Sequence, residues 1–297
     1  MDPSRFTNWF AIRDFVPTVH KDTYPYISPV KADLSGKSVF ITGASKGIGR
    51  AIALSFARAG CSHIAVATRS DLPDLERDIL AAAAAAGRSK PLVLTFSMDV
   101  SSEAAVDAAA VEISKSFGGA LDVLVNNAGR CETIGPVEAS RVDDFWASWE
   151  VNIKGVYLCT RALLPLLRRS ATRTVINTSS AAAHMLFEGV LGYQTSKFAL
   201  CRLTEFLAKE HEADGLIAIA AHPGDVLTDL TSRTPDKWKG FFDQTPEMAG
   251  DTYVWLAREC RDWLSGRFIS TAWDMEELVV RKVDILKGDL LKFRLTV

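Results

Sequence analysis

Seven short apolar runs alternate with longer stretches of helical periodicity along most of this 297-residue chain. The runs are rich in β-branched residues and are apolar almost throughout, which is typical of strands covered on both faces of a parallel sheet. The expected strands are Ser38–Thr42, His63–Thr68, Leu92–Ser97, Leu121–Asn126, Thr174–Ser179, Leu216–Ala221 and Arg267–Thr271. Repeated strand–helix units predict a doubly wound α/β fold of about seven strands, with right-handed crossovers and helices on both faces.

The helical stretches divide the chain into one large unit and two short ends. The expected helices are Gly49–Ala59, Asp74–Ala86, Glu103–Phe117, Phe145–Leu167, Gln194–His211 and Met248–Cys260. No second core-sized block follows the last strand, so we expect one domain over residues 34–273, within the usual size range. An N-terminal arm (1–33) and a charged C-terminal tail (274–297) flank it.

The composition gives no support for nucleic-acid, membrane or metal partners. The net charge of −2 gives no electrostatic reason to expect nucleic acid or an anionic membrane as the main partner. We expect no signal peptide and no spanning segment, because no run reaches the ~20 apolar residues that a transmembrane helix needs. The five cysteines form no CxxC pair, which favours a reducing, cytoplasmic location, and neither cysteines nor histidines have the spacing of a metal site.

A glycine-rich loop follows the first expected strand and opens the first expected helix. It runs Thr42-Gly43-Ala44-Ser45-Lys46-Gly47-Ile48-Gly49. Such glycines permit a sharp turn and a close approach of pyrophosphate, whose charge is then stabilised by the helix N-terminus. The spacing is GxxxGxG rather than GxGxxG, with the same physical logic. The loop predicts a Rossmann-type dinucleotide site.

The end of the second expected strand bears on which dinucleotide is bound. An NAD site usually has an acidic residue here for the ribose 2′-hydroxyl, whereas an arginine accommodates a 2′-phosphate. Neutral Thr68 is followed by Arg69, and Lys46 in the glycine loop adds a second cation. These charges favour NADP(H) over NAD(H), although Asp71 is a nearby acid and both cations have an alternative interpretation as solvated surface charges.

Tyr193 and Lys197 lie one helical turn apart at the start of an expected helix, so their side chains share a face. A Tyr-x-x-x-Lys pair is weak evidence by itself. Ser180, thirteen residues before Tyr193, follows an expected strand, and ligands bind at the carboxyl ends of strands in open α/β sheets. Ser179 competes with Ser180 for a catalytic role, and only the spacing to Tyr193 favours Ser180.

Further blocks occur in a fixed order along the chain: Asp99-Val100, Asn126 to Gly129, Asn152 within Val151–Gly155, and Pro223-Gly224 followed by Val226 and Thr228. Together with the glycine loop and the Ser180, Tyr193 and Lys197 set, they resemble the short, single-domain branch of the short-chain dehydrogenase/reductase family. The resemblance covers about Leu34 to Thr271. The longer N-terminal arm and the charged tail depart from many relatives, and we expect them to cover the pocket or a neighbouring subunit.

The resemblance implies a role for each motif residue. Tyr193 is implied as the acid/base, Ser180 as a hydrogen-bond donor to the substrate oxygen, and Asn152 as the residue that positions water leading toward Lys197. Lys197 is implied to hold the nicotinamide ribose and, with oxidised nicotinamide, to lower the pKa of Tyr193. The implied cofactor-binding residues are Gly43, Ser45, Lys46, Gly47, Ile48, Gly49, Thr68, Arg69, Asp99, Val100, Asn126, Ala128, Gly129, Tyr193, Lys197, Pro223, Gly224, Val226 and Thr228.

Residues 229–250 are implied to form a lid over the substrate. Its aromatic residues Trp238, Phe241 and Phe242 favour an apolar carbonyl or alcohol substrate, with lid packing as the alternative. Residues 181–187 are expected to line the same cavity, where His184 is interpreted as a pocket or loop residue. The two longest helices are implied to form a homodimer or homotetramer.

Several interpretations remain open at this stage. Asn126 and Asn127 have an alternative role in ending a strand, and Asn152 has one in satisfying a backbone group. The main functional hypothesis is an NADP(H)-dependent carbonyl reductase or alcohol dehydrogenase. The alternatives are a cofactor-binding sensor or scaffold without hydride chemistry, and an isomerase or cyclase on the same fold.

Overall fold

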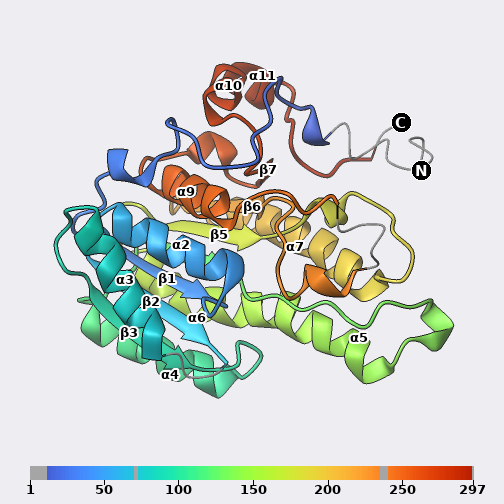
Figure 1. The fold of residues 1–297 in the computed structure, drawn as a ribbon, viewed down its shortest axis with the longest axis horizontal. Helices are drawn as coiled ribbons and strands as arrows, with labels where there is room; N and C mark the ends of the chain where they lie inside the picture. The colour runs from blue at the N-terminus through green and yellow to red at the C-terminus, as the bar shows by residue number, and fades with distance from the viewer. Residues whose placement is uncertain (1–11, 70–72, 235–239, 296–297) are drawn as a thin grey trace.

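Seven parallel strands form one sheet in the computed structural model, which describes residues 12–69, 73–234 and 240–295 (Figure 1). The strand order is β3-β2-β1-β4-β5-β6-β7. The strands are β1 (Ser38–Thr42), β2 (His63–Thr68), β3 (Leu92–Ser97), β4 (Val123–Asn126), β5 (Thr174–Thr178), β6 (Ile217–His222) and β7 (Arg267–Ser270). The predicted fold is confirmed, and the bounds of the first three strands are those that the sequence predicts.

Helices cover both faces of the sheet (Figure 1). On one face α2 (Gly47–Arg58) packs against α3 (Pro73–Ala85) and α9 (Pro246–Ala257). On the other face lie α4 (Glu103–Ser116), α6 (Val156–Leu167) and α7 (Leu191–Glu210). Two buried apolar clusters fill these two layers, as a sheet of fully apolar strands requires.

The long helix predicted over Phe145–Leu167 is interrupted. The structure has α5 (Val142–Trp149), a π-helical segment η4 (Glu150–Gly155) and then α6. Gly155 lies so close to β3's following loop that a Cβ on it would be 2.6 Å from Val100 Cγ2. Single π-helical turns inside α-helices are frequent at functional sites, and this one carries Asn152.

The described part of the arm packs on the domain and on the start of the tail. The Trp273 indole donates a hydrogen bond of 2.7 Å to the Ile12 carbonyl. Thr18 hydrogen-bonds Glu277 through both its backbone and its hydroxyl, and His20 contacts Asp274. The fully buried side chains of Ile27, Met275, Leu278 and Ile285 belong to the same apolar cluster as the domain. Arm and tail therefore extend the domain core.

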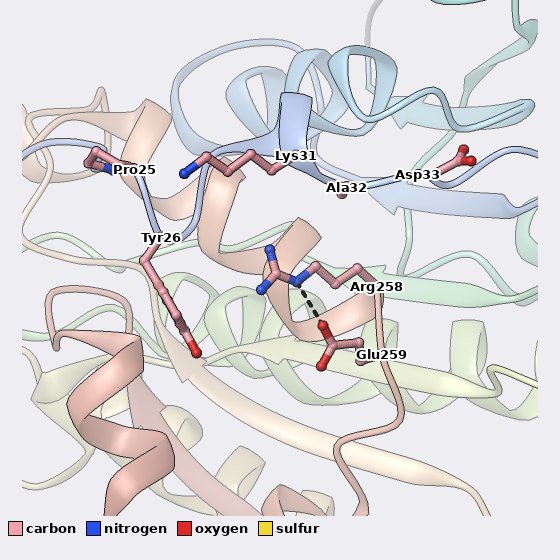
Figure 2. A pocket seen from close by; sticks show the side chains of 7 residues that line it. All are labelled: Pro25, Tyr26, Lys31, Ala32, Asp33, Arg258 and Glu259. Carbon is pink, nitrogen blue, oxygen red and sulfur yellow. Dashed lines mark ion pairs between the residues drawn. The ribbon is translucent and has the colours of Figure 1, made fainter.

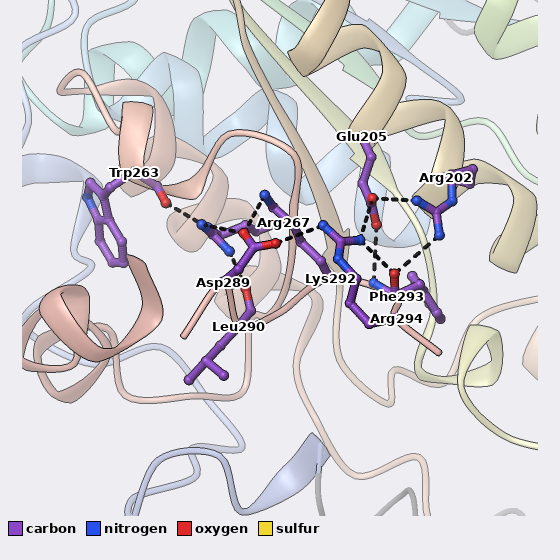
Figure 3. Close-up of polar contacts among 9 residues, drawn as sticks. All are labelled: Arg202, Glu205, Trp263, Arg267, Asp289, Leu290, Lys292, Phe293 and Arg294. Atoms are coloured by element: carbon purple, nitrogen blue, oxygen red, sulfur yellow. Dashed lines mark hydrogen bonds and ion pairs between the residues drawn. The ribbon is translucent and has the colours of Figure 1, made fainter. Parts of the chain in front are cut away.

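The tail forms α10 (Met275–Val280) and α11 (Lys282–Lys287), and then residues 289–294 run along β7 and α7. Figure 3 shows the polar contacts that hold this last segment. Buried Arg267 contacts Asp289, while Glu205 accepts hydrogen bonds from Phe293 N and from Arg294. The backbone N–H of Phe268 donates to the Leu291 carbonyl. The segment thus covers the outer edge of β7.

A cavity of about 420 Å³ lies at the opposite end of the sheet from the strand carboxyl ends (Figure 2). It is lined by Pro25, Tyr26, Lys31, Ala32, Asp33, Arg258 and Glu259. Ala32 and Asp33 precede β1, and Arg258 and Glu259 precede β7, so the cavity sits where these parallel strands begin. It is therefore separate from the predicted cofactor site.

Candidate active site

The strand order reverses between β1 and β4, whose carboxyl ends meet there. A Cβ on Gly43, which follows β1, would lie only 2.7 Å from Ala128 Cα. The amide of Asn127 donates to the carbonyls of Thr42 and Gly43, and the Thr42 hydroxyl accepts from the N–H groups of Asn127 and Ala128. These contacts join the two loops at the switch point where α/β sheets bind nucleotides.

The glycine loop has the backbone that the dinucleotide hypothesis requires. Gly43 and Gly47 have φ angles of 67° and 53°, a region that favours glycine. A Cβ on Gly49 would lie 2.2 Å from the Gly43 carbonyl oxygen, so no larger residue fits. Helix α2 begins at Gly47, after Ser45 and Lys46, and Ile48 lies in its first turn. The loop therefore has backbone without side chains that a ligand can approach closely, next to a helix N-terminus. Both features fit a pyrophosphate.

The predicted 2′-phosphate cations lie at the surface. Thr68 ends β2 and is buried, while Arg69 is exposed beside it. Lys46 forms an ion pair with Asp229, and both side chains are exposed. Asp71 lies outside the described residues.

The Asp99-Val100 block follows β3. Asp99 accepts two hydrogen bonds from Ser101, and these bonds, with smaller contributions from the charges of Arg69 and Lys154, keep the pKa of its carboxyl below the ordinary value. Val100 is buried against Gly155. The two residues thus link the end of β3 to the π-helical segment.

Tyr193, Lys197 and Ser180 come together at the carboxyl edge. Tyr193 and Lys197 lie in the first turns of α7, with Lys197 Nζ 5.8 Å from the centre of the Tyr193 ring. The hydroxyl of Ser180 lies near the Tyr193 phenol and acts to lower its pKa. Lys197 is 3% exposed and donates a 2.7 Å hydrogen bond to the Thr178 carbonyl at the end of β5.

Ser179 has a different environment from Ser180. It is buried, its hydroxyl donates to the Lys197 carbonyl, and it also contacts Cys201 Sγ at 3.1 Å. Ser180 accepts a hydrogen bond from Ala182 N and is the serine that acts on the pKa of Tyr193. The contacts of Ser179 are those of a structural residue.

The side chains of Asn152 and Asn126 form hydrogen bonds with other residues of the protein. Asn152 donates to the Arg130 carbonyl at 2.8 Å and to Ser196 Oγ at 2.9 Å, and its oxygen accepts from Arg130 N. A Cβ on Gly129 would lie 3.7 Å from both Asn152 Oδ1 and Lys197 Nζ, so these two atoms approach the same point.

Asn126 is buried and donates to Asn177 and Thr160. Its side chain therefore ties β4 to β5 and α6, which is the structural role that the sequence left open.

Burial has the largest effect on the pKa values of Tyr193 and Lys197. It raises the pKa of Tyr193 to about 12, even though the hydrogen bond from Ser180 acts in the opposite direction. It lowers the pKa of Lys197 to about 8. Desolvation of the phenolate is the largest cause of the shift, and nearby negative charges, including those of Glu132 and Asp225, act in the same direction. A lower phenol pKa beside bound oxidised nicotinamide stays a prediction.

Glu132 is a site residue that sequence reasoning missed. Its buried carboxylate accepts a 3.0 Å hydrogen bond from the backbone N–H of Tyr193 and another from the Ser148 hydroxyl. A carboxylate at the N-terminus of a helix is stabilised by the unpaired N–H groups there. Glu132 thereby fixes the start of α7, where the tyrosine lies, and no motif in the sequence indicates this.

The loop after β6 reaches both the lid region and the glycine loop. A Cβ on Gly224, whose φ is 93°, would lie 2.5 Å from Gln244 Oε1, and Val226 pairs with Gln244 through a β-bridge. The Thr228 methyl would be 3.3 Å from a Cβ on Gly47. Pro223 is buried at the start of the loop.

The described parts of the lid and the pocket loop are partly exposed. In the lid region Phe241 is exposed and Phe242 is half-buried, whereas Trp238 lies outside the described residues. His184 stacks on Phe293 of the tail at 4.4 Å and contacts Phe268, and burial lowers its pKa to about 4. The tail therefore reaches the loop that follows Ser180.

Comparison with known proteins agrees with this geometry. A family profile for short chain dehydrogenases matches residues 37–238. The chain is 46% identical to a short chain dehydrogenase of Monascus purpureus over 281 residues, which cover 95% of this chain and 96% of that protein. It is 43% identical to a short chain dehydrogenase of Emericella variicolor, with 96% of this chain and 97% of that one covered.

A solved short-chain type dehydrogenase/reductase from Mycobacterium marinum has the same fold, with a TM-score of 0.71 at 27% identity. The match covers 80% of this chain and 94% of that one. No described helix is long and apolar enough to cross a membrane. On the profile match and these identities, the chain belongs to the short-chain dehydrogenase/reductase family of oxidoreductases.

Proposed function

We propose that this protein is an NADP(H)-dependent oxidoreductase that reduces the carbonyl group of a small, apolar molecule or oxidises the corresponding secondary alcohol. The main support is the placement of Tyr193, Ser180 and buried Lys197 together at the carboxyl edge of the sheet, with Lys197 Nζ 5.8 Å from the centre of the Tyr193 ring. This edge also carries the glycine loop, whose close packing fits a dinucleotide.

In reduction, Tyr193 acts as the acid that protonates the carbonyl oxygen. Its pKa of about 12 in the protein alone means that the phenol keeps its proton at neutral pH. Ser180 donates a hydrogen bond to the same oxygen and stabilises the negative charge that develops there. The bound dinucleotide supplies the hydride, or accepts it in the reverse direction.

Lys197 and Asn152 support the proton transfer. The Lys197 ammonium is charged below its pKa of about 8 and is assigned to the nicotinamide ribose hydroxyls. In oxidation its charge, together with that of oxidised nicotinamide, favours the phenolate form of Tyr193. Asn152 is assigned to a water-mediated path toward Lys197, because its oxygen and the ammonium converge near Gly129.

The preference for NADP(H) is assigned to the end of β2. Thr68 is neutral at the position where an NAD site usually has an acidic residue, and the exposed Arg69 is available to a phosphate dianion. Lys46 already pairs with Asp229, so its charge is partly neutralised and Arg69 is the principal cation in this proposal.

Exposed apolar side chains on the loops around Tyr193 support an apolar substrate. Leu186 precedes α7, Leu227 follows β6 and Phe241 lies in the lid region, and each is exposed, Leu186 almost fully. Apolar side chains are also exposed on α5, α6 and α7, which supports a homodimer or homotetramer through these helices; they are Val142, Trp146, Tyr157 and Phe206.

All five cysteines are free, as expected in the cytoplasm.

The test is turnover of a panel of ketones and aldehydes with NADPH. We expect loss of NADPH absorbance with an equal amount of alcohol formed, faster than with NADH. Tight binding of NADPH without oxidation across the panel would instead favour a scaffold. A rearranged product without net consumption of NADPH would favour an isomerase or cyclase.

A further inference from the structure

One carboxyl group lies near Tyr193 and has no part in the mechanism above. Asp225 follows Pro223 and Gly224 on the loop that leaves β6 at the carboxyl edge of the sheet. Its negative charge is one of the influences that raise the pKa of Tyr193, so the carboxyl is within electrostatic reach of the phenol. The side chain is 17% exposed, which keeps it accessible to a ligand at this edge.

The backbone of Asp225 is fixed on both sides by Gln244. Asp225 N donates a 2.8 Å hydrogen bond to Gln244 Oε1, and Gln244 N donates to the Asp225 carbonyl at 3.1 Å. The left-handed Gly224 allows the glutamine to approach this closely. The carboxyl group is thus held in place by the backbone, as a preorganised binding group must be.

The carboxyl group itself makes no hydrogen bond with any other described residue. His222 Nε2 lies 3.7 Å from Asp225 Oδ1, which is too long for a hydrogen bond. A half-buried polar group without such a partner is ready to bond a ligand, because burial without a hydrogen bond is costly.

Among the described residues, three ionisable groups act on Asp225 or lie beside it: Tyr193 from α7, His222 from β6 and Asp243 from the segment before α9. Burial, with the charge of Asp243 as a second cause, raises the pKa of Asp225 to about 7. Burial also lowers the pKa of His222 to about 3, so the imidazole is neutral and offers no cation to a carboxylate. Below pH ~7 the carboxyl therefore carries a proton and acts as a donor.

We propose that Asp225 is a specificity-determining residue that donates a hydrogen bond to a second oxygen of the substrate while Tyr193 and Ser180 bind the reacting carbonyl. The substrate class is then a mostly apolar carbonyl compound with a further carbonyl or hydroxyl oxygen. This inference rests on the proposed function and narrows its substrate class.

The test compares two ketones of equal size, one with a second oxygen and one with a methylene group in its place. Wild type is expected to favour the oxygenated ketone at least ~10-fold in kcat/KM, since a site built for a polar group discriminates against an analogue that lacks it. Asp225→Asn retains a donor and keeps most of this preference. Asp225→Leu loses the preference but still reduces the methylene analogue within about threefold of wild type.

The pH dependence gives a second readout that a structural role would not produce. In wild type the preference falls as the pH rises through ~7, because the carboxylate can no longer donate and repels the second oxygen. In Asp225→Asn the preference stays constant over the same range, because the amide does not titrate.

Equal losses on both ketones in Asp225→Leu, or the same pH dependence in wild type and Asp225→Asn, would overturn the inference. Reduction of both ketones without any preference in wild type overturns it too, while leaving the proposed function intact. Failure of wild type to reduce any carbonyl overturns both.

Discussion

Side chains that are distant in the sequence build the site at the residue scale. The spacing of Tyr193, Lys197 and Ser180, together with the other motifs, led to the prediction that they lie close together, because one helix face and one strand end set their positions. The groups that accept hydrogen bonds from Tyr193 and Lys197 could not be predicted from the sequence. The N–H of Tyr193 donates to Glu132 and Lys197 donates to the Thr178 backbone carbonyl, and neither contact leaves a periodic or motif signal.

The choice of dinucleotide is also a property of single residues. Arg69→Ala is expected to weaken NADPH binding about 10- to 100-fold, since a charge-assisted hydrogen bond contributes about 1.5–3 kcal/mol. NADH binding should change less than about threefold, because NADH lacks the 2′-phosphate. Titration of both cofactors by fluorescence measures the two losses.

Arg77→Ala is a matched control for this substitution. Arg77 is an exposed arginine on α3 whose ion pairs are with Asp74 and Asp78. Its removal should leave both affinities unchanged. Equal losses of NADPH and NADH affinity in Arg69→Ala would show that Arg69 does not bind the 2′-phosphate.

Among the elements of the fold, the strands were easier to predict than the interruption of a long helix or the path of the C-terminal tail. Runs such as Ser38–Thr42 and His63–Thr68 are apolar on both faces, so their bounds are visible in the sequence. The π-helical segment at Glu150–Gly155 depends on the contact of Gly155 with Val100, which periodicity does not reveal. The charged tail likewise gave no sign that its last residues would cover β7.

Phe293 is the apolar centre of that last segment, in contact with His184 and Phe198. Phe293→Ala is expected to lower the free energy of unfolding by about 1–3 kcal/mol, because aromatic contacts and part of a buried ring are lost. The loop after Ser180 loses its stacking partner, so kcat should fall more than NADPH affinity. Urea unfolding and steady-state kinetics measure the two effects.

Leu295→Ala provides the control in the same segment. Leu295 is 89% exposed, and such substitutions usually change stability by less than about 0.5 kcal/mol. If Phe293→Ala were as stable and as active as Leu295→Ala, the tail would not support the loop after Ser180.

At the scale of the whole molecule, the chain is one parallel sheet whose carboxyl edge carries the site and whose two termini extend its core. The relative from Monascus purpureus matches 95% of the chain, whereas the solved Mycobacterium marinum structure matches 80%. The fold was predictable because alternating strands and helices allow few arrangements. The packing of arm and tail on the domain was not, because it depends on long-range contacts such as that of Ile12 with Trp273.

In the proposed function, the Tyr193 phenol is the acid/base of a redox reaction at this edge. The most direct measurement compares Tyr193→Phe with wild type in turnover with NADPH and a reducible ketone, alongside NADPH binding. We expect turnover to fall by at least about 100-fold, since general acid catalysis contributes about 10²–10⁴, with NADPH affinity nearly unchanged. The control is Tyr26→Phe, which alters a tyrosine of the cavity at the opposite end of the sheet. Retention of wild-type turnover in Tyr193→Phe would contradict the account.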